Sequence, residues 1–246
     1  MRAFLILEDG TVFTGESIGS TRDAISEIVF NTSMTGYLEV LTDPSYAGQA
    51  VCMTYTLIGN YGITPDMEST KPWPDGFIVR ELSRIPSTLR CEGTIQDFLV
   101  KHDIPGISGI DTRALTKILR EKGTMNGMIT TNEAYDFEEI LPKLKAYSTG
   151  DVVSKVTCKE KYVLKGKGKK VALMDFGAKK NIAKSVNDRG CEVTVVPAHT
   201  PASEILNGGF DGIMLSNGPG DPKDCGPIID EVKKLYDSKM PILAIW

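Results

Sequence analysis

Short apolar runs separated by turn residues fill the first half of the chain, a pattern that predicts β-strands. Residues 4–7 and 11–14 flank Glu8-Asp9-Gly10, and an Asp-Gly pair between two apolar runs is typical of a tight hairpin. Four later runs of the same kind predict further strands at residues 27–30, 49–55, 76–80 and 127–130.

Helical spacing appears in three other stretches of this half. Asp43-Pro44 ends the first of them, Asp111 is a good N-cap for the third, and Gly123 terminates it. The predicted helices cover residues 36–42, 94–101 and 112–122. Residues 1–150 are therefore predicted to form a mixed α+β domain.

The pattern changes near residue 150. Ser148-Thr-Gly-Asp151 is followed by a Lys- and Gly-rich stretch at 165–170, so we place a linker at residues 151–169. Beyond it, strands are predicted at 171–175, 193–196, 212–215 and 242–245, and helices at 178–188, 201–206 and 226–237. Such βαβ alternation predicts an α/β domain with a parallel sheet over residues 170–246.

The last predicted strand is followed directly by Trp246. A four-stranded sheet whose final strand lacks a covering helix leaves apolar surface and an open edge. We therefore expect residues 170–246 to be an incomplete domain. The open edge could also pair two chains as a homodimer.

The composition of the chain mainly excludes certain classes of protein. The 246 residues are 41% apolar and 24% charged, as in ordinary globular proteins, and a net charge of −4 argues against a nucleic-acid partner. No apolar stretch is long enough to span a bilayer, and acidic residues follow Met1 too early for a signal peptide. We expect a cytoplasmic protein that binds neither nucleic acid nor membrane.

The cysteines are odd in number and lack Cys-x-x-Cys spacing, which indicates reduced thiols rather than a disulfide framework or a zinc site. They are Cys52, Cys91, Cys158, Cys191 and Cys225. His102 and His199 have no ligand-like neighbours in the sequence and are interpreted as structural or solvent-facing. No metal site is predicted.

The most informative stretch is 215–222, Leu-Ser-Asn-Gly-Pro-Gly-Asp-Pro, between a buried strand and a charged helix. Ligands of parallel sheets bind at such loops. Gly218 and Gly220 let the backbone approach a ligand with its N–H groups turned outward, while Pro219 stiffens the turn. The loop is a candidate oxyanion hole or carboxylate cradle. An ordinary turn is the alternative for an isolated Gly-Pro-Gly.

Longer motifs on both sides of the linker carry a resemblance to a known family. The first half strongly resembles the amino-terminal domain of the small (glutaminase) subunit of carbamoyl-phosphate synthase at residues 30–49, 57–62 and 109–116. The second half resembles the class I glutamine amidotransferase domain of that subunit at residues 175–182, 189–197 and 215–222. The resemblance implies a flavodoxin-like fold for this second domain.

The resemblance also implies a function. The small subunit hydrolyses L-glutamine and passes ammonia through a tunnel to a large subunit, which makes carbamoyl phosphate from bicarbonate and ATP for arginine and pyrimidine synthesis. ATP and magnesium act on the large subunit, so no cofactor is expected in this chain. We expect the amino-terminal domain to carry much of the large-subunit contact.

Three glutamine-binding residues follow from the family motifs. The glycine loop, here Gly218 and Gly220, donates backbone N–H groups to the glutamine carbonyl as it becomes an oxyanion. A serine in the Asp43-Pro-Ser-Tyr46 turn, here Ser45, reaches the amino-acid end of the substrate. A small hydroxyl and backbone donors can bind a zwitterion without a charged side chain. Taken without the resemblance, Ser45 is better interpreted as a turn-stabilising residue.

The chain departs from the family at its end. The family continues the last strand as Ile-Cys-Leu-Gly-His-Gln, which exposes a cysteine nucleophile, and a His-x-Glu pair follows much later. Here Ile245 is followed by Trp246, whose indole occupies the nucleophile position and cannot form a thioester. Cys225 precedes a helix and does not match that position. No catalytic residue is predicted, and the chain alone is expected to be inactive.

Two other functional classes stay open. One is a non-catalytic pseudo-glutaminase that serves as a structural or regulatory partner of a large subunit. The other is a flavodoxin-like nucleotide or flavin binder, which is disfavoured because the loop at 175–179, Asp-Phe-Gly-Ala-Lys, lacks a Gly-x-Gly-x-x-Gly fingerprint.

Overall fold

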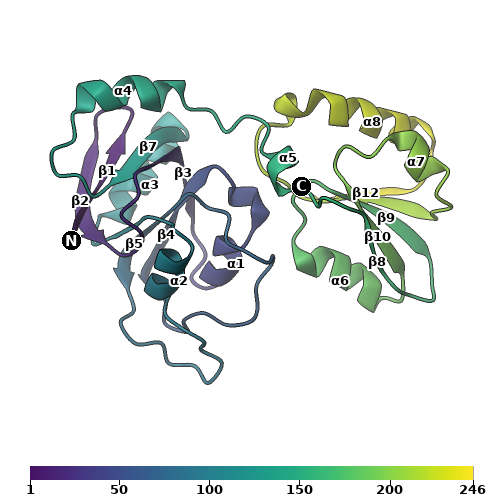
Figure 1. Cartoon of the computed structure of the whole chain (residues 1–246), viewed down its shortest axis with the longest axis horizontal. Helices are drawn as coiled ribbons and strands as arrows, with labels where there is room; N and C mark the ends of the chain where they lie inside the picture. Colours follow the sequence, from purple (N-terminus) through teal and green to yellow (C-terminus); the bar gives the residue numbers. More distant parts are fainter. Residues whose placement is uncertain (246) are drawn as a thin grey trace. The chain divides into compact units, whose positions relative to one another are not determined.

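The computed structural model describes residues 1–245, which divide into two compact units (Figure 1). The first unit comprises Met1–Thr42 and Gly48–Thr149. The second comprises Asp43–Ala47 and the chain from Gly150 onward. The short turn at Asp43–Ala47 therefore belongs to the second unit by its contacts, although its chain neighbours belong to the first.

The first unit is built on a closed β-barrel. Its strands are β1 (Arg2–Leu7), β2 (Val12–Ser17), β3 (Ala24–Asn31), β4 (Gln49–Ile58), β5 (Gly76–Leu82), β6 (Gly106–Ser108) and β7 (Met125–Thr130). Its helices are α1 (Tyr37–Leu41), α2 (Ile95–Lys101), α3 (Thr112–Lys122) and α4 (Phe137–Ala146). All strands and helices predicted for this region form, and β6 and α4 are additional.

The barrel order is β1-β2-β6-β5-β4-β3-β7, and β7 closes it by pairing antiparallel with both β1 and β3. The predicted hairpin is confirmed, since β1 and β2 pair antiparallel around Gly10, whose φ is 88°. The β3–β4, β4–β5 and β5–β6 pairs are parallel. Closure leaves no free edge in the barrel, and alternation of apolar residues alone did not predict it.

Helix α3 closes the apolar core of this unit. Its N-cap is Asp111, whose Oδ1 accepts the N–H of Ala114 at 3.0 Å, as the sequence predicts. Leu115 and Leu119 are buried in one apolar cluster with strand residues such as Ile78. A fully buried leucine contributes about 1.5–3 kcal/mol relative to an exposed one, so the barrel and α3 stabilise each other.

The second unit is an α/β sandwich. Its helices are α5 (Val153–Val156), α6 (Lys180–Asp188), α7 (Ala202–Leu206) and α8 (Gly226–Asp237), with 3-10 turns η1 (Pro44–Tyr46) and η2 (Pro222–Cys225). Its strands are β8 (Tyr162–Leu164), β9 (Lys170–Asp175), β10 (Glu192–Pro197), β11 (Gly212–Leu215) and β12 (Ile242–Ala244).

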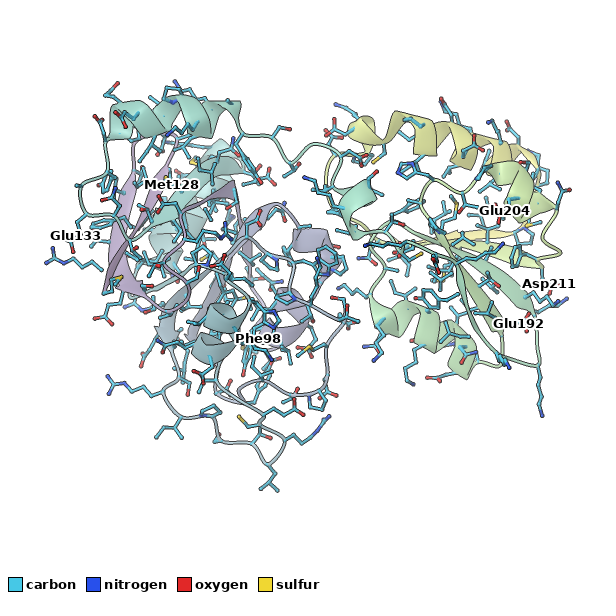
Figure 2. The ribbon with its side chains drawn as sticks, viewed as in Figure 1. Phe98, Met128, Glu133, Glu192, Glu204 and Asp211 are labelled. Atoms are coloured by element: carbon cyan, nitrogen blue, oxygen red, sulfur yellow. The ribbon has the colours of Figure 1, made fainter. Side chains whose placement is uncertain are left out.

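The sheet order is β12-β11-β9-β10-β8, and its first four strands are parallel, as the alternation of elements predicts. Helix α6 covers one face of the sheet, and α7 and α8 cover the other (Figure 1). Figure 2 shows Glu192 and Asp211 at the amino ends of their strands, where Lys169 Nζ lies 2.8 Å from Asp211 Oδ1. The loops after Asp175 and Leu215 lie at the opposite, carboxyl ends.

Two expectations about this unit differ from the structure. The segment expected to be a linker, 151–169, contains α5 and β8, and β8 pairs antiparallel with β10, so the sheet has five described strands rather than four. Tyr162 and Val163 are exposed, because β8 is an edge strand. Its apolar run, Tyr162-Val-Leu164, is only three residues long, shorter than the run of about four to eight by which a buried strand is predicted.

The other edge of the sheet is β12, and Leu243 on it is 63% exposed. In the part of the chain that the structure describes, no helix is both long and apolar enough to cross a membrane.

A fragment of residues 1–149 should fold on its own, because the barrel and α3 form a core without any residue of the second unit. Circular dichroism and urea unfolding should show a cooperative transition. A fragment of residues 1–123 is the control and should be unfolded, because it lacks β7 and so leaves β1 and β3 each paired on one side only. An unfolded 1–149 fragment would show that the barrel depends on the rest of the chain.

Candidate glutamine-binding site

The candidate site begins at Asp175, the last residue of β9. This carboxylate is buried, and its Oδ1 accepts the backbone N–H groups of Gly177 at 2.9 Å and Ala178 at 2.7 Å. Its Oδ2 accepts the N–H of Cys158 at 2.7 Å. Hydrogen bonds to a charged acceptor contribute about 1.5–3 kcal/mol each, so Asp175 fixes the loop before α6.

The same geometry bears on the nucleotide-binding alternative. A nucleotide phosphate binds to free backbone N–H groups at the start of such a helix. Here the amides of Gly177 and Ala178 already bond to a carboxylate, which would also repel a phosphate. The loop is therefore unsuited to the phosphate of a flavin or nucleotide.

Ser216 and Asn217, directly after β11, connect this loop to the glycine loop. Ser216 Oγ accepts the N–H of Phe176 at 2.9 Å and donates to the carbonyl of Asn217 at 2.7 Å. Asn217 Nδ2 donates to the carbonyl of Gly177 at 3.2 Å. The strand-end residues thus hold the glycine loop against the Phe176–Gly177 backbone.

Both predicted glycines are required by the backbone. At Gly218, a Cβ atom would lie 2.9 Å from the Cβ of Phe176 and closer still to its carbonyl oxygen. Gly220 has φ of 82°, in the left-handed region, and a Cβ there would lie 2.8 Å from Val152. Within the described residues, neither the Gly218 nor the Gly220 amide has a hydrogen-bond acceptor. Two N–H donors are therefore available to a ligand.

Ser45 lies in the same unit through the turn at Asp43–Ala47. Asp43 Oδ1 accepts the Ser45 N–H at 2.9 Å, and its Oδ2 lies 2.8 Å from Lys179 Nζ. The Asp43 side chain is only 6% exposed, so this ion pair is shielded from solvent on its acidic side. Ser45 Oγ accepts a hydrogen bond from Asn217 Nδ2 at 2.8 Å.

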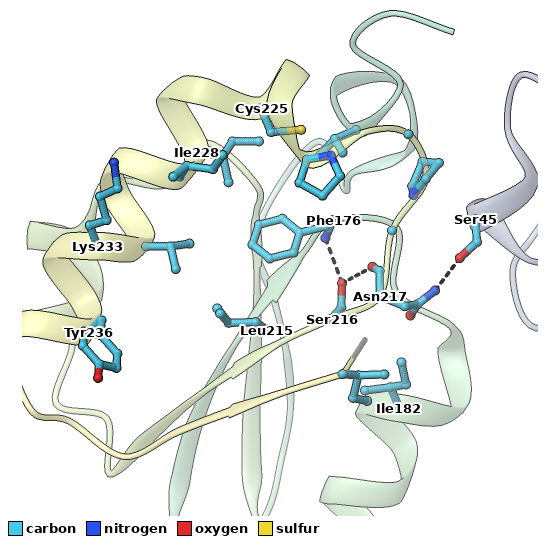
Figure 3. Close-up of a pocket in the computed structure, with 18 of the residues that line it drawn as sticks. Ser45, Phe176, Ile182, Leu215, Ser216, Asn217, Cys225, Ile228, Lys233 and Tyr236 are labelled. Carbon is cyan, nitrogen blue, oxygen red and sulfur yellow. Dashed lines mark hydrogen bonds between the residues drawn. The ribbon is translucent and has the colours of Figure 1, made fainter.

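One pocket of about 1000 Å³ brings Ser45, Gly218 and Gly220 together (Figure 3). Its polar end carries the hydroxyl of Ser45 and the glycine loop. Its remaining wall is mostly apolar and includes Phe176, Leu215, Ile182, Ile228, Val232 and Tyr236. An apolar pocket with a few convergent polar groups is typical of a small-molecule site.

Cys225 also lines this pocket, but its chemistry is that of an inert thiol. Burial raises its pKa, and the carboxylates of Asp151, Asp224 and Asp221 raise it further. Since the thiolate is the nucleophilic form, a raised pKa lowers reactivity at neutral pH. The other cysteines are free thiols as well.

A second cluster contains a serine, a histidine and an aspartate, the residue types of a hydrolase triad, but they are not arranged as in such a triad. Ser154 Oγ lies 2.5 Å from Asp151 Oδ2 and 2.7 Å from His199 Nε2. Ser154 Oγ donates its hydrogen bond to Asp151 Oδ2, which lowers the pKa of Asp151. His199 Nε2 must then donate to Ser154 and cannot act as its base. His199 is exposed, in agreement with its interpretation from sequence as structural or solvent-facing.

The nucleophile position, Trp246, lies outside the described residues. The described residues contain no group of three or more His, Cys, Asp or Glu side chains placed to hold a metal ion.

Comparison with known proteins assigns both halves of the chain. Residues 5–129 match the family model "Carbamoyl-phosphate synthase small chain, CPSase domain", and residues 172–245 match that of "Glutamine amidotransferase class-I". The chain belongs to the carbamoyl-phosphate synthase small-chain family. The first match covers the barrel, and the second covers the sheet from β9 to β12.

Curated relatives of this family align along the whole chain. The carbamoyl phosphate synthase small chain of Clostridium perfringens is 51% identical over 246 residues, which are 100% of this chain and 70% of the relative. The pyrimidine-specific small chain of Halalkalibacterium halodurans is 48% identical, covering 100% of this chain and 68% of the relative. The small chain of Photorhabdus laumondii is 46% identical, covering 99% and 68%.

Sequence reasoning named three candidate residues that line this pocket in the small-chain family member, Ser45, Gly218 and Gly220, but missed the residues that hold them. Asp175, Ser216 and Asn217 stand inside the motifs that carry the resemblance, yet their hydrogen bonds join different loops. Strand-end position was the one available signal. Asp175 and Ser216 end or follow neighbouring parallel strands, where polar side chains converge.

Substituting Gly218 by alanine should lower the free energy of unfolding by about 1–3 kcal/mol, because the added methyl group has to displace backbone. Gly226→Ala is the matched control: it lies in α8, a Cβ there meets no atom within 4 Å, and alanine favours the helix. Urea unfolding of both variants measures the difference. Equal free energies of unfolding for the two variants would show that the glycine loop accommodates the added methyl group without cost.

Cys225 should react with iodoacetamide more slowly than a cysteine in an unfolded peptide at pH 8, because a raised thiol pKa leaves less thiolate at that pH. Its rate should keep rising with pH above the range in which the peptide rate levels off. Mass spectrometry of the alkylated peptide gives both rates. A faster reaction than that of the urea-unfolded chain would identify Cys225 as an activated thiol.

Proposed function

We propose that this chain is the glutamine-binding small chain of a glutamine-hydrolysing carbamoyl-phosphate synthase, a ligase, and that it works with a large chain. The observation that supports this most strongly is the convergence of Ser45, Gly218 and Gly220 on one pocket, with two unpaired amides. Family membership supplies the substrate class, and the site supplies the donors that such a substrate needs.

The roles follow from the chemistry of the glutamine side chain. Its amide carbonyl is a neutral acceptor that gains negative charge when a nucleophile attacks. Preorganised N–H donors such as those of Gly218 and Gly220 stabilise that charge without any rearrangement. Ser45 can donate its hydroxyl proton to the carboxylate end of the amino acid, because Asn217 already donates to its oxygen.

The described residues bind glutamine under this proposal but do not hydrolyse it. The thiol in the pocket, Cys225, has a raised pKa, and no described histidine lies in the pocket lining. Loss of the nucleophile in a covalent mechanism costs on the order of 10⁶ in turnover even when the oxyanion hole remains. Ammonia for the large chain's carbamoyl phosphate then requires a nucleophile and base beyond these residues.

Calorimetry should detect saturable binding of L-glutamine to the 246-residue chain, while ammonia release stays at the level of the blank. Ser45→Ala should weaken binding about threefold to tenfold, the cost of one hydrogen bond of about 0.5–1.5 kcal/mol. Ser87→Ala, an exposed serine of the first unit, is the matched control and should leave the Kd unchanged.

Three outcomes would contradict the proposal in different ways. Ammonia above the blank would show that the chain contains its own nucleophile. Absence of glutamine binding, together with retained binding to a large chain, would favour a pseudo-glutaminase that acts only as a structural or regulatory partner. Equal Kd values for Ser45→Ala and the parent chain would remove Ser45 from the site.

A further inference from the structure

The first unit contains a second large pocket, of about 1030 Å³, which the proposed function does not use. We call it the cationic pocket, because Arg80, Arg113, Lys117 and Arg120 line it. Arg80 lies on β5, and the other three lie on α3. Hydroxyl groups of threonines on β4 and α3 complete the lining.

The charges of this pocket are poorly compensated. Four cations face two acids, Asp111 and Glu121, and Asp111 already accepts the N–H of Ala114 as the helix cap. Glu121 lies 3.9 Å from Lys117, a weak exposed contact. The guanidinium groups of Arg80, Arg113 and Arg120 have no hydrogen-bond or ion-pair partner among the described residues.

Two other arginines of the same unit, Arg22 and Arg90, are paired, whereas Arg2 and Arg84 stand apart from the pocket. Arg22 lies 3.2 Å from a carboxylate oxygen of Asp103, and Arg90 lies 2.8 Å from one of Asp66. The chain as a whole carries a net charge of −4, so acidic residues are not scarce. Three arginines without a side-chain partner in the described chain, Arg80, Arg113 and Arg120, therefore gather in this one pocket although the chain has a net negative charge.

Helix α3 bears a local cost from this arrangement. Arg113, Lys117 and Arg120 are spaced by four and three positions, so they share one helix face. Like charges at this spacing destabilise a helix by about 0.2–0.5 kcal/mol per pair. An anionic ligand on this face would turn the repulsion into attraction.

The exposure of the side chains indicates what kind of anion fits. All four cationic side chains are exposed, and no buried charged donor lies in the pocket as it would in an enclosed metabolite site. A wide, solvent-facing pocket with exposed guanidinium groups suits carboxylates presented by another protein surface.

We infer that the cationic pocket docks an acidic segment of the large-chain partner, with its carboxylates on Arg113 and Arg120. This inference rests on the proposed function, which supplies the partner. Charge complementarity of this kind speeds association and fixes orientation, and it is weakened by salt.

The test measures binding of the whole chain to an immobilised large chain of a bacterial carbamoyl-phosphate synthase at 50, 150 and 300 mM NaCl (about 14, 8 and 6 Å of screening length). The parent chain should bind more weakly as salt rises. R113E/R120E should raise the Kd at least tenfold at the lowest salt and flatten the salt dependence. R113Q/R120Q should fall between the two.

R84E/K143E is the matched control, because it makes the same charge change at two exposed positions of the same unit outside the pocket. Its Kd should stay within about twofold of the parent value, since neither residue lines the pocket and salt screens exposed charges. Thermal melting of each variant confirms that α3 remains folded.

The outcomes separate this inference from the proposed function. If the parent chain binds and R113E/R120E binds equally well, the docking site is wrong and the proposed function stands. If the parent chain does not bind the large chain, both fail. Saturable binding of inorganic phosphate that R113E/R120E loses, with large-chain binding unchanged, would identify a small-anion site and overturn the docking inference.

Discussion

The buried carboxylate of Asp175 is the constraint on which the candidate site depends. It binds three backbone N–H groups from two loops, and its own carbonyl accepts a hydrogen bond from Thr157 at 2.6 Å. The Phe176–Gly177 backbone fixed in this way is the surface against which Ser216, Asn217 and Gly218 lie. The glycine loop is positioned by these contacts, and the backbone amides of Gly218 and Gly220 have no acceptor among the described residues.

The elements that sequence predicted well are those with strong local signals. The strand Gly212–Leu215 and the helix Gly226–Asp237 match the prediction at both ends. A continuous apolar run marks the strand, and helical spacing that begins at a glycine marks the helix. The strand Tyr162–Leu164 was missed, since its apolar run of three residues between lysines is too short to mark a strand. Barrel closure by β7 was also missed, because it depends on pairing between residues far apart in sequence.

The site residues divide in the same way, into those with a local sequence signal and those that depend on long-range contacts. Gly218 and Gly220 could be selected from the sequence because a Gly-Pro-Gly loop after a buried strand has a physical meaning of its own. Ser45 came only from the family resemblance, since nothing local links it to residues more than 170 positions later; its contact with Asn217 is a property of the fold. A single polar side chain, Asn217, joins the two predicted parts by donating to Ser45 and to Gly177.

The most direct measurement is an amide NMR titration of the ¹⁵N-labelled chain with L-glutamine. The Gly218 and Gly220 amides should shift in a saturable manner as they gain an acceptor, whereas the amide of Gly190, which already bonds to Asn187 at 2.8 Å, should not. Shifts that leave Gly218 and Gly220 unchanged, or that map to residues outside this pocket, would contradict the assignment of the glycine loop as the carbonyl-binding site.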